Sequence, residues 1–174
     1  DLVANGLDAL RLIFKAYIEL GFMKVGDEVI VPANTYIASV LAISDNDLIP
    51  VFVEPKSNTY NIDSSKIEKI ITSKTKAIAV VHYAGVACEM DKIMAIAQKY
   101  NLAVIEDAAQ GIMSKYKDKA LGSIGDLGTY SFHETKNIIA GEGGLGINQL
   151  TEGLQLMVDI IGNQLSGAWA SFTL

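Results

Sequence analysis

The sequence has little of what extracellular and membrane proteins depend on. It contains one cysteine, Cys88, which excludes an internal disulfide framework and favours a reducing cytoplasm. Its apolar runs are strand-sized and interrupted by polar residues or glycine, so no segment is expected to span a bilayer. No basic stretch leads into an apolar one after Asp1, so no secretory signal is expected either. Because the first residue is not Met, we expect the chain to be a piece of something longer.

The chain also lacks positive charge. Its formal net charge is −6, its isoelectric point is near 4.8, and its lysines are scattered rather than clustered. Nucleic acid and anionic membrane surfaces are therefore not expected as partners. Beyond Asp159 no charged residue occurs at all, which is unusual for the surface of an acidic protein. We expect one domain over residues 1–149, and then a helix and an atypical uncharged tail over residues 150–174.

Short apolar runs alternate with segments of helical periodicity along most of the chain. This alternation is typical of βαβ units, and it predicts an α/β fold with a mostly parallel sheet covered by helices on both faces. Asp63 is expected to cap a short helix, and Lys115 to Lys119 a polar hairpin. The expected strands are 28–31, 48–53, 77–81, 102–105, 128–132 and 145–148, and the expected helices are 7–18, 35–43, 90–100 and 150–161.

One lysine, Lys136, follows an expected strand among small and apolar neighbours. A lysine in such a place can be desolvated and made ready to form a Schiff base with an aldehyde. Most lysines after strands are solvated surface groups, so this interpretation depends on other residues. Asp107 ends another strand, where a carboxylate can keep the ring nitrogen of a pyridoxal cofactor protonated, although a helix-capping or solvated aspartate is the simpler alternative.

Two further positions fit the same kind of site. Gly6 lies in a turn before a helix, where a close backbone approach and unpaired N–H groups can hold a phosphate. An ordinary Asn-Gly turn is the alternative there. Tyr36 follows the strand that ends at Pro32 and can offer a flat face to an aromatic ring. Along an α/β chain these positions correspond to a phosphate, a ring face, a ring nitrogen and an aldehyde carbon.

A metal site is not expected. His82, Cys88, Glu89 and Asp91 are metal-ligand types, but their spacing is unpaired, so core or pocket-lining roles are expected for them. The glycines of Gly141–Gly144 precede a strand and lack the strand–glycine–helix context of a dinucleotide-binding loop.

The motifs together resemble the DegT/DnrJ/EryC1/StrS family of sugar-nucleotide aminotransferases. The resemblance extends from about Ala4 to Asn148. It implies the large, catalytic domain of the aspartate-aminotransferase fold type I, with pyridoxal 5′-phosphate (PLP) as cofactor. A C-terminal small domain and the start of the large domain are expected to be absent from this chain. The motifs that carry the resemblance are Asn5–Leu10, Gly26–Pro32, Glu106–Gln110, Ser131–His133 and Lys136–Asn137.

The resemblance also implies roles for individual residues. Lys136, beside Asn137, would hold the cofactor as a Schiff base and then shuttle a proton between C4′ and the substrate carbon. Asp107 would pair with the pyridinium nitrogen, and Gln110 would lie near the phenolic oxygen. Tyr36 would stack on the ring. Ser131 would bind the phosphate at the Gly6 turn, together with the backbone amides of Leu7 and Asp8.

For the activity, the resemblance implies amino transfer from glutamate to a nucleotide-linked keto-6-deoxyhexose by a homodimer, usually for O-antigen or other surface polysaccharides. Family members that dehydrate sugars have a histidine in place of Lys136, so the lysine favours transamination. Val81–Asp91 and His133–Lys136 resemble the transaminases that act at C4, whereas Asn5–Leu10 and Pro32–Ser39 resemble those that act at C3. We favour C4, because residues beside the lysine are closer to the reacting carbon. A non-catalytic cofactor- or partner-binding fragment and a plain nucleotide-binding α/β domain are the alternatives.

Overall fold

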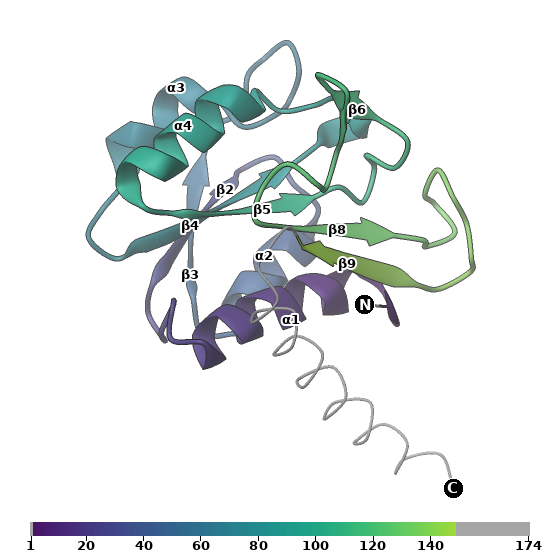
Figure 1. Ribbon diagram of the computed structural model, residues 1–174, viewed down its shortest axis with the longest axis horizontal. Helices are drawn as coiled ribbons and strands as arrows, with labels where there is room; N and C mark the ends of the chain where they lie inside the picture. Colours follow the sequence, from purple (N-terminus) through teal and green to yellow (C-terminus); the bar gives the residue numbers. More distant parts are fainter. Residues whose placement is uncertain (1, 149–174) are drawn as a thin grey trace, which may run out of the picture.

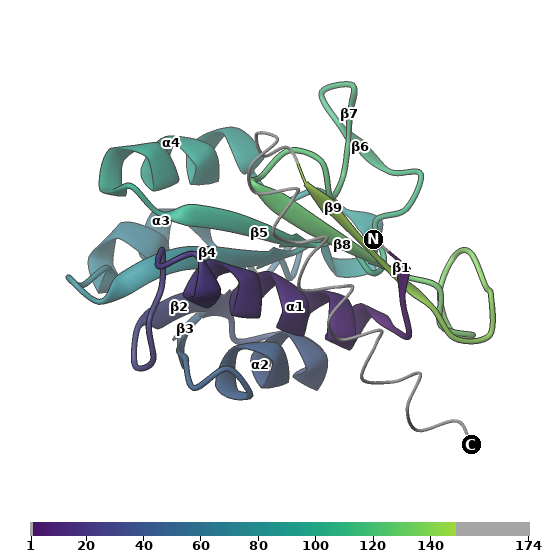
Figure 2. The ribbon, with the colours of Figure 1, turned by 60° about the horizontal axis from the view of Figure 1, so that its bottom comes forward.

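The protein is described by a computed structural model covering residues 2–148. A seven-stranded sheet in the order β1-β9-β8-β5-β4-β2-β3 runs through its middle. Helices α1 (Gly6–Glu19) and α2 (Ile37–Ser44) cover one face of the sheet, and α3 (Ser64–Ile67) and α4 (Met90–Tyr100) cover the other (Figures 1 and 2). The protein is thus a three-layer α/β structure. No helix in the described range is long and apolar enough to cross a membrane.

Five neighbouring strands of the sheet pair in parallel, and the last two strands at one edge, β9 and β1, join by antiparallel pairing. Strands β8 and β9 pair antiparallel, and β9 pairs antiparallel with β1, so the sheet is mixed at this edge. A small separate hairpin, β6 (Lys115–Tyr116) with β7 (Lys119–Ala120), interrupts the chain between β5 and β8. The strands of the large sheet are β1 (Leu2–Val3), β2 (Glu28–Pro32), β3 (Ile49–Val53), β4 (Thr75–Val81), β5 (Ala103–Asp107), β8 (Leu127–Ser131) and β9 (Gly144–Asn148).

Alternating residues of the central strands divide the core in two. In β2, Val29 and Val31 pack toward α1 and α2, whereas Ile30 packs toward α3 and α4. All three are fully buried, because the strand has helices on both faces. In β5, Ile105 joins the first core and Val104 the second. This alternation decides which side of the sheet each polar residue at a strand end will face.

Helix ends are set by the residues that favour such ends. The Asn5 side chain accepts a hydrogen bond from the Asp8 amide at 2.9 Å and caps α1. Asp63 caps α3 through the Ser65 amide at 3.1 Å. Helix α4 ends at Asn101, which adopts the left-handed conformation with φ 53°.

Most of the expected elements are confirmed. The helix at 90–100 has the expected bounds, Asp63 is a helix cap, and the Lys115 to Lys119 hairpin forms. The helix expected at 35–43 begins later, at Ile37, because Tyr36 has an extended backbone. Strand β1 was not foreseen, since two residues carry no periodicity. The helix expected at 150–161 and the uncharged tail lie outside the described residues.

Tyr17 offers a test of the core between α1 and the sheet. Its ring is buried, and its hydroxyl has no hydrogen-bond partner among the described residues. Burial, followed by the nearby Asp126 carboxylate, raises the pKa of Tyr17. An unsatisfied buried hydroxyl costs about 1–3 kcal/mol. We therefore expect Tyr17→Phe to raise the free energy of unfolding by about 1 kcal/mol in urea denaturation.

Tyr130 provides the matched control for this substitution. It is also buried, but its hydroxyl donates a hydrogen bond to the Leu121 carbonyl. Tyr130→Phe should therefore lower the free energy of unfolding by about 1 kcal/mol. Equal losses in the two variants would contradict the assignment of the Tyr17 hydroxyl as unsatisfied.

Candidate active site

The parallel strands all end along the same side of the sheet, its carboxyl edge, where the polar residues of the candidate site gather. Strands β5 and β8 run side by side, with Asp107 opposite Thr129, and both point the same way (Figure 1). Asp107 ends β5 and Ser131 ends β8, and Tyr36 follows the end of the parallel strand β2. Ligands of open α/β sheets bind at this kind of edge.

The start of α1 contacts the end of β8. A Cβ atom added to Gly6 would lie 3.0 Å from the Ser131 Cβ and 3.5 Å from its Oγ. Ser131 is itself buried, and its hydroxyl is directed to the same place as the first turn of the helix. The amides of a first helical turn have no partner within the helix and carry partial positive charge. Gly6, the amide of Leu7 and the Ser131 hydroxyl therefore form a cradle that suits a phosphate.

Asp8 takes part in the helix cap rather than being an open donor. Its amide donates to the Asn5 Oδ1 at 2.9 Å, and its carboxylate accepts from the Asn5 Nδ2 at 3.0 Å. The Arg11 guanidinium lies 3.1 Å from the other carboxylate oxygen. A phosphate that used the Asp8 amide would have to share it with Asn5. The signal for this cap is the Asn5–x–x–Asp8 spacing itself.

Asp107 is buried, with 8% of its surface exposed, and it faces the side of the sheet that α2 covers. The Ser39 hydroxyl of α2 donates to its Oδ2 at 2.7 Å, and the Ala109 amide donates to its Oδ1 at 3.1 Å. Among the described residues no lysine, arginine or histidine pairs with this carboxylate. Its charge is therefore held by neutral donors and remains available to a cationic group of a ligand.

Gln110 is fixed by a turn that follows β4. Its Oε1 accepts a hydrogen bond of 2.6 Å from the amide of Ala84, whose φ of 52° lies in the left-handed region. A Cβ at the next residue, Gly85, would lie 2.9 Å from the Gln110 carbonyl oxygen, so this turn packs against it closely. Because Oε1 is engaged, the side-chain NH₂ of Gln110 is the group left to contact a ligand oxygen.

The segment after β8 brings Lys136 to the same edge. The Lys136 amide donates to the His133 carbonyl at 2.9 Å, which closes a turn. The next residue, Asn137, lies with its Nδ2 3.5 Å from the Gln110 carbonyl oxygen. Lys136 is half-buried, and no hydrogen bond or ion pair of its Nζ lies within the described residues. Its amine therefore has no partner among the described residues, and the next residue contacts the segment that follows β5.

Tyr36 lies at the start of α2, three residues before Ser39, which contacts Asp107. Its side chain is 73% exposed, so its ring is open to a partner. The structure thus brings Gln110 and Asn137 together through one direct contact and Gly6 and Ser131 through another, and Asp107 lies three residues before Gln110 at the end of β5. For Tyr36 and Lys136 the contacts are made by nearby residues of the chain: Ser39 contacts Asp107, and Asn137 contacts Gln110.

The profile of DegT/DnrJ/EryC1/StrS aminotransferases matches residues 2–152. The chain belongs to this family. It is 61% identical over 130 residues to dTDP-3-amino-3,6-dideoxy-alpha-D-galactopyranose transaminase of Aneurinibacillus thermoaerophilus, a match over 75% of this chain and 35% of that protein. It is 48% identical over 143 residues to GDP-perosamine synthase of Escherichia coli O157:H7, over 82% of this chain and 38% of that protein.

Solved aminotransferases have the same fold. An aminotransferase from Psychrobacter cryohalolentis superposes with a TM-score of 0.83 at 40% identity, over 90% of this chain and 39% of that one. A Streptococcus pneumoniae protein assigned as a sugar aminotransferase, solved in its PLP form, gives 0.81 at 30% identity, over 91% and 45%. The chain thus has the α/β large-domain fold of type I aminotransferases and spans less than half the length of these relatives.

The buried acid of this aminotransferase chain that sequence reasoning missed is Glu106. It is fully buried on the face of β5 opposite to Asp107, where its Oε2 lies 2.8 Å from the His82 Nε2. It also accepts hydrogen bonds from the amides of Gly122, Ile124 and Gly125. A glutamate inside an otherwise apolar strand was the available signal, because a buried charge must be paired.

The residues considered for a metal have other partners. The His82 Nδ1 accepts from the Cys88 amide at 3.2 Å, which makes Nε2 the protonated ring nitrogen facing Glu106. Burial, then the Glu106 carboxylate, raises the pKa of Cys88 to about 12, so this thiol is inert. Hydrogen bonds from Lys56, Lys92 and Ser64 lower the pKa of Glu89 to about 2. Within residues 2–148 no group of three or more such side chains is placed to hold a metal.

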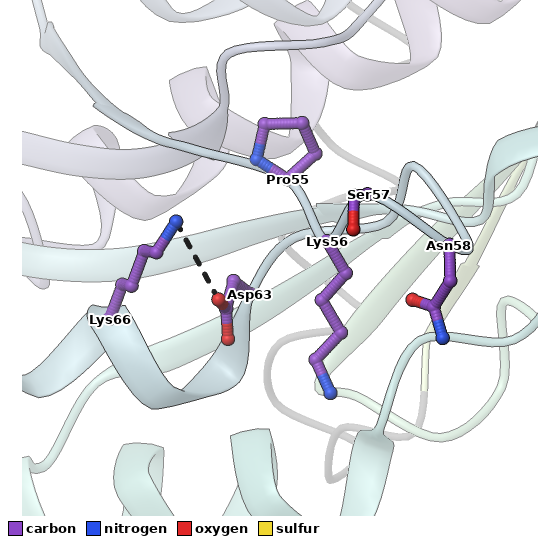
Figure 3. A pocket seen from close by; sticks show the side chains of 6 residues that line it. All are labelled: Pro55, Lys56, Ser57, Asn58, Asp63 and Lys66. Atoms are coloured by element: carbon purple, nitrogen blue, oxygen red, sulfur yellow. Dashed lines mark ion pairs between the residues drawn. The ribbon is translucent and has the colours of Figure 1, made fainter.

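A surface pocket lies elsewhere, between β3 and α3 (Figure 3). Its lysines are paired with acids: the Lys66 Nζ is 3.6 Å from Asp63, and the Lys56 Nζ is 2.6 Å from Glu89. Strands β2 and β4 separate β3 from Asp107 on β5. The pocket is therefore distinct from the candidate active site, and its positive charge is already neutralised. It is lined by Pro55, Lys56, Ser57, Asn58, Asp63 and Lys66.

Proposed function

We propose that the full-length gene product containing this chain is a PLP-dependent aminotransferase that moves an amino group from glutamate to a nucleotide-linked keto-6-deoxyhexose. The observation that supports this proposal most directly is the Asp107 carboxylate, which is buried at the end of β5 and bound by neutral donors alone among the described residues; the Gly6–Ser131 contact and the unpartnered Lys136 amine support it further. Family membership and relatives named as nucleotide-sugar transaminases support the substrate class. The single cysteine supports a cytoplasmic location.

The residues present fit PLP. Gly6 leaves the space against Ser131 that a side chain would fill, so a phosphate can approach the first turn of α1. Asp107 has no cationic partner among the described side chains, so it can bind the ring N–H. Gln110 presents its NH₂ toward a ring oxygen, and Tyr36 offers an exposed ring face. Asn137 braces the lysine-bearing turn against the Gln110 carbonyl.

When bound, PLP supplies an electron sink that stabilises negative charge on the substrate carbon. The protein holds the cofactor in place and moves protons. Asp107 would hold a proton on the ring nitrogen. The Lys136 Nζ would bind the cofactor and would be the base that takes and returns one proton at the substrate carbon. Ser131 and the α1 amides would bind the phosphate and so fix the position of the cofactor.

The dimeric state is part of the proposal. Large apolar side chains are exposed at or near the site edge, including Ile37 at 55%, Met113 at 86% and Ile139 at 63%. Such side chains favour burial by another protein surface. A homodimer, which the family resemblance implies, would cover them and complete the pocket around Lys136.

The decisive experiment is incubation of the full-length gene product with glutamate and dTDP-4-keto-6-deoxyglucose or its 3-keto isomer. We expect an amino sugar in the mass spectrum, and NMR will show which carbon bears the nitrogen. The 61% identity to a 3-amino-sugar transaminase supports C3; the residues beside Lys136 support C4. Cofactor binding without amino transfer to either sugar would favour the alternative, a non-catalytic cofactor- or partner-binding protein.

Gly6→Ala tests the phosphate cradle. The new Cβ would lie 3.0 Å from the Ser131 Cβ, so α1 and β8 must move apart by a few tenths of an ångström. Overpacking of this kind costs about 1–3 kcal/mol. We expect weaker PLP binding, by about tenfold in equilibrium dialysis, because the first-turn amides and the Ser131 hydroxyl no longer converge.

The matched control for Gly6→Ala is Gly146→Ala in β9. A Cβ at Gly146 would meet no atom of the described residues within 4 Å, and Gly146 lies outside the Gly6–Ser131 contact, so this variant should bind PLP as the wild type does. Equal PLP affinity in all three proteins would show that the phosphate is held elsewhere.

A further inference from the structure

A chain of hydroxyl groups runs from the turn before α2, through Ser39 of that helix, to Asp107. The Thr35 Oγ1 lies 2.9 Å from the Ser39 Oγ, and the Ser39 Oγ lies 2.7 Å from the Asp107 Oδ2. A serine hydroxyl has one proton, and the carboxylate can only accept. Ser39 therefore donates to Asp107, and Thr35 donates to Ser39. The chain has one direction, toward the carboxylate.

Ser39 is an unusual residue for its position. The helix around it is apolar, from Ile37 to Ile43, and Ser39 itself is 3% exposed. A buried serine within a helix commonly bonds its hydroxyl to the carbonyl four residues earlier. Ser39 is instead directed across the interface between helix and sheet, to a residue 68 positions later in the chain. Burying a hydroxyl here is compensated by this charge-assisted bond.

The geometry around Asp107 gives the hydroxyl a specific effect. Ser39 binds Oδ2 and the Ala109 amide binds Oδ1, so each carboxylate oxygen has one protein donor and the carboxylate cannot rotate freely. Each oxygen still has acceptor capacity for a ligand. Both donors are neutral, so they orient the carboxylate without neutralising its charge.

We propose that Ser39, supported by Thr35, is a positioning residue that orients the Asp107 carboxylate toward the ring nitrogen of the cofactor. This inference rests on the proposed function. It assigns a role to two residues of α2 and the turn before it, which do not themselves bind the reacting atoms. Ser39 strengthens the contact between Asp107 and the ring N–H, and Thr35 fixes the direction of the Ser39 hydroxyl.

The test uses a ligand pair that differs only at the ring nitrogen. The full-length gene product is titrated with PLP and with 1-deazapyridoxal phosphate, in which C–H replaces that nitrogen. Wild-type protein should prefer PLP. In Ser39→Ala the ratio of the two dissociation constants should fall by about tenfold, the effect of losing one hydrogen bond to a charged group. The comparison is a double-mutant cycle between Ser39 and the ring nitrogen.

A merely structural role for Ser39 gives a different result. Ser39→Ala would then weaken binding of both ligands by the same factor and leave the preference unchanged, which would overturn the proposal. Ser44→Ala is the matched control, because Ser44 lies on the same helix, is exposed, and bonds only the Leu41 carbonyl at 3.3 Å. It should leave both affinities at their wild-type values.

Thr35→Val keeps the proposal testable if Ser39→Ala does not fold. Thr35 is half-buried at the start of α2, and valine retains its shape without the hydroxyl. The preference for PLP should narrow by a few-fold, since the Ser39 hydroxyl loses its partner; an unchanged preference would count against the chain. If wild-type protein binds neither ligand at Lys136, the proposed function fails. If it binds PLP and the variants match it, only this inference fails.

Discussion

Replacing Lys136 by alanine is expected to abolish covalent capture of PLP and to reduce amino transfer by about 10²–10⁴-fold. The Lys136 Nζ has no hydrogen bond or ion pair within the described residues, and the next residue, Asn137, contacts the Gln110 carbonyl. Alanine keeps the backbone amide that donates to the His133 carbonyl, so the turn should form as before. The measurement is the visible absorbance of added PLP, followed by borohydride reduction and mass mapping of the modified peptide.

A second lysine shows whether the effect is specific. Lys69 is exposed, and Lys69→Ala should leave absorbance, reduction and turnover unchanged. Wild-type protein should carry the reduced cofactor on the peptide that contains Lys136. A Lys136→Ala protein that still gave a borohydride-stable adduct at full yield would remove Lys136 from the active site. Thermal unfolding of both variants should match that of the wild type, because neither side chain has a hydrogen bond or ion pair among the described residues.

The elements that sequence reasoning located well are those whose signals lie within a few residues. Helix α4 begins and ends where its apolar spacing and Asn101 indicate, and the left-handed φ of 53° at Asn101 explains why the helix stops there. Asp63 caps its helix through an amide two residues away. Strand β1 depends on the pairing of Leu2 with Leu145, and the antiparallel direction of β9 depends on its pairing with β8; no local pattern encodes either.

The candidate site also has a part that the sequence could predict and a part that it could not. Asp107 and Ser131 end neighbouring parallel strands, so both lie at the carboxyl edge of the sheet, as expected from their places in the sequence. What holds them there was not predictable, because the partners are distant in the chain. Ser39 lies 68 residues from Asp107, and a Cβ on Gly6 would meet Ser131, far along the chain. The occupation of the Asp8 amide by Asn5 is local, and the spacing could have revealed it.

Two consecutive residues of β5 have different roles: Glu106 is structural, and Asp107 belongs to the candidate site. Successive side chains of a strand point to opposite faces. Glu106 therefore faces the α3 and α4 side, where His82 and the turn from Gly122 to Gly125 surround it. Asp107 faces the α2 side and Ser39. Glu106 holds the turn that precedes β8, and Asp107 is available to a ligand. A substitution at Glu106 should therefore affect Asp107 through the backbone that joins them.

The second large effect is expected at Glu106. Its carboxylate is fully buried and accepts hydrogen bonds from His82 at 2.8 Å and from the amides of Gly122, Ile124 and Gly125 at 2.5–2.8 Å. Glu106→Ala would leave these donors buried without an acceptor. A buried donor left without an acceptor costs about 1–3 kcal/mol, and four donors are affected here, so the loss is a large part of the roughly 5–15 kcal/mol that stabilises a typical domain. Urea denaturation at pH 7 should show this loss.

The same carboxylate predicts a pH dependence of stability. Burial raises the pKa of Glu106, but hydrogen bonds from His82 and from the amides of Gly125 and Gly122 outweigh burial, so the pKa lies below its usual 4.5. A carboxyl whose folded pKa is lowered stabilises the fold above its unfolded pKa and loses that contribution as pH falls through the folded pKa. The stability gap between wild type and Glu106→Gln should therefore be constant above pH 4.5 and narrow below it.

Glu54→Gln is the control for this titration, because Glu54 is exposed and its side chain has no hydrogen bond or ion pair within the described residues. Its stability should follow that of the wild type at every pH. A gap for Glu106→Gln that stayed constant down to pH 3 would mean that the carboxylate keeps its charge in the unfolded chain as readily as in the fold. The bonds from His82 and the turn amides would then favour the charged carboxyl no more than the neutral one, and the loss in Glu106→Ala would come from the cavity and the unsatisfied donors.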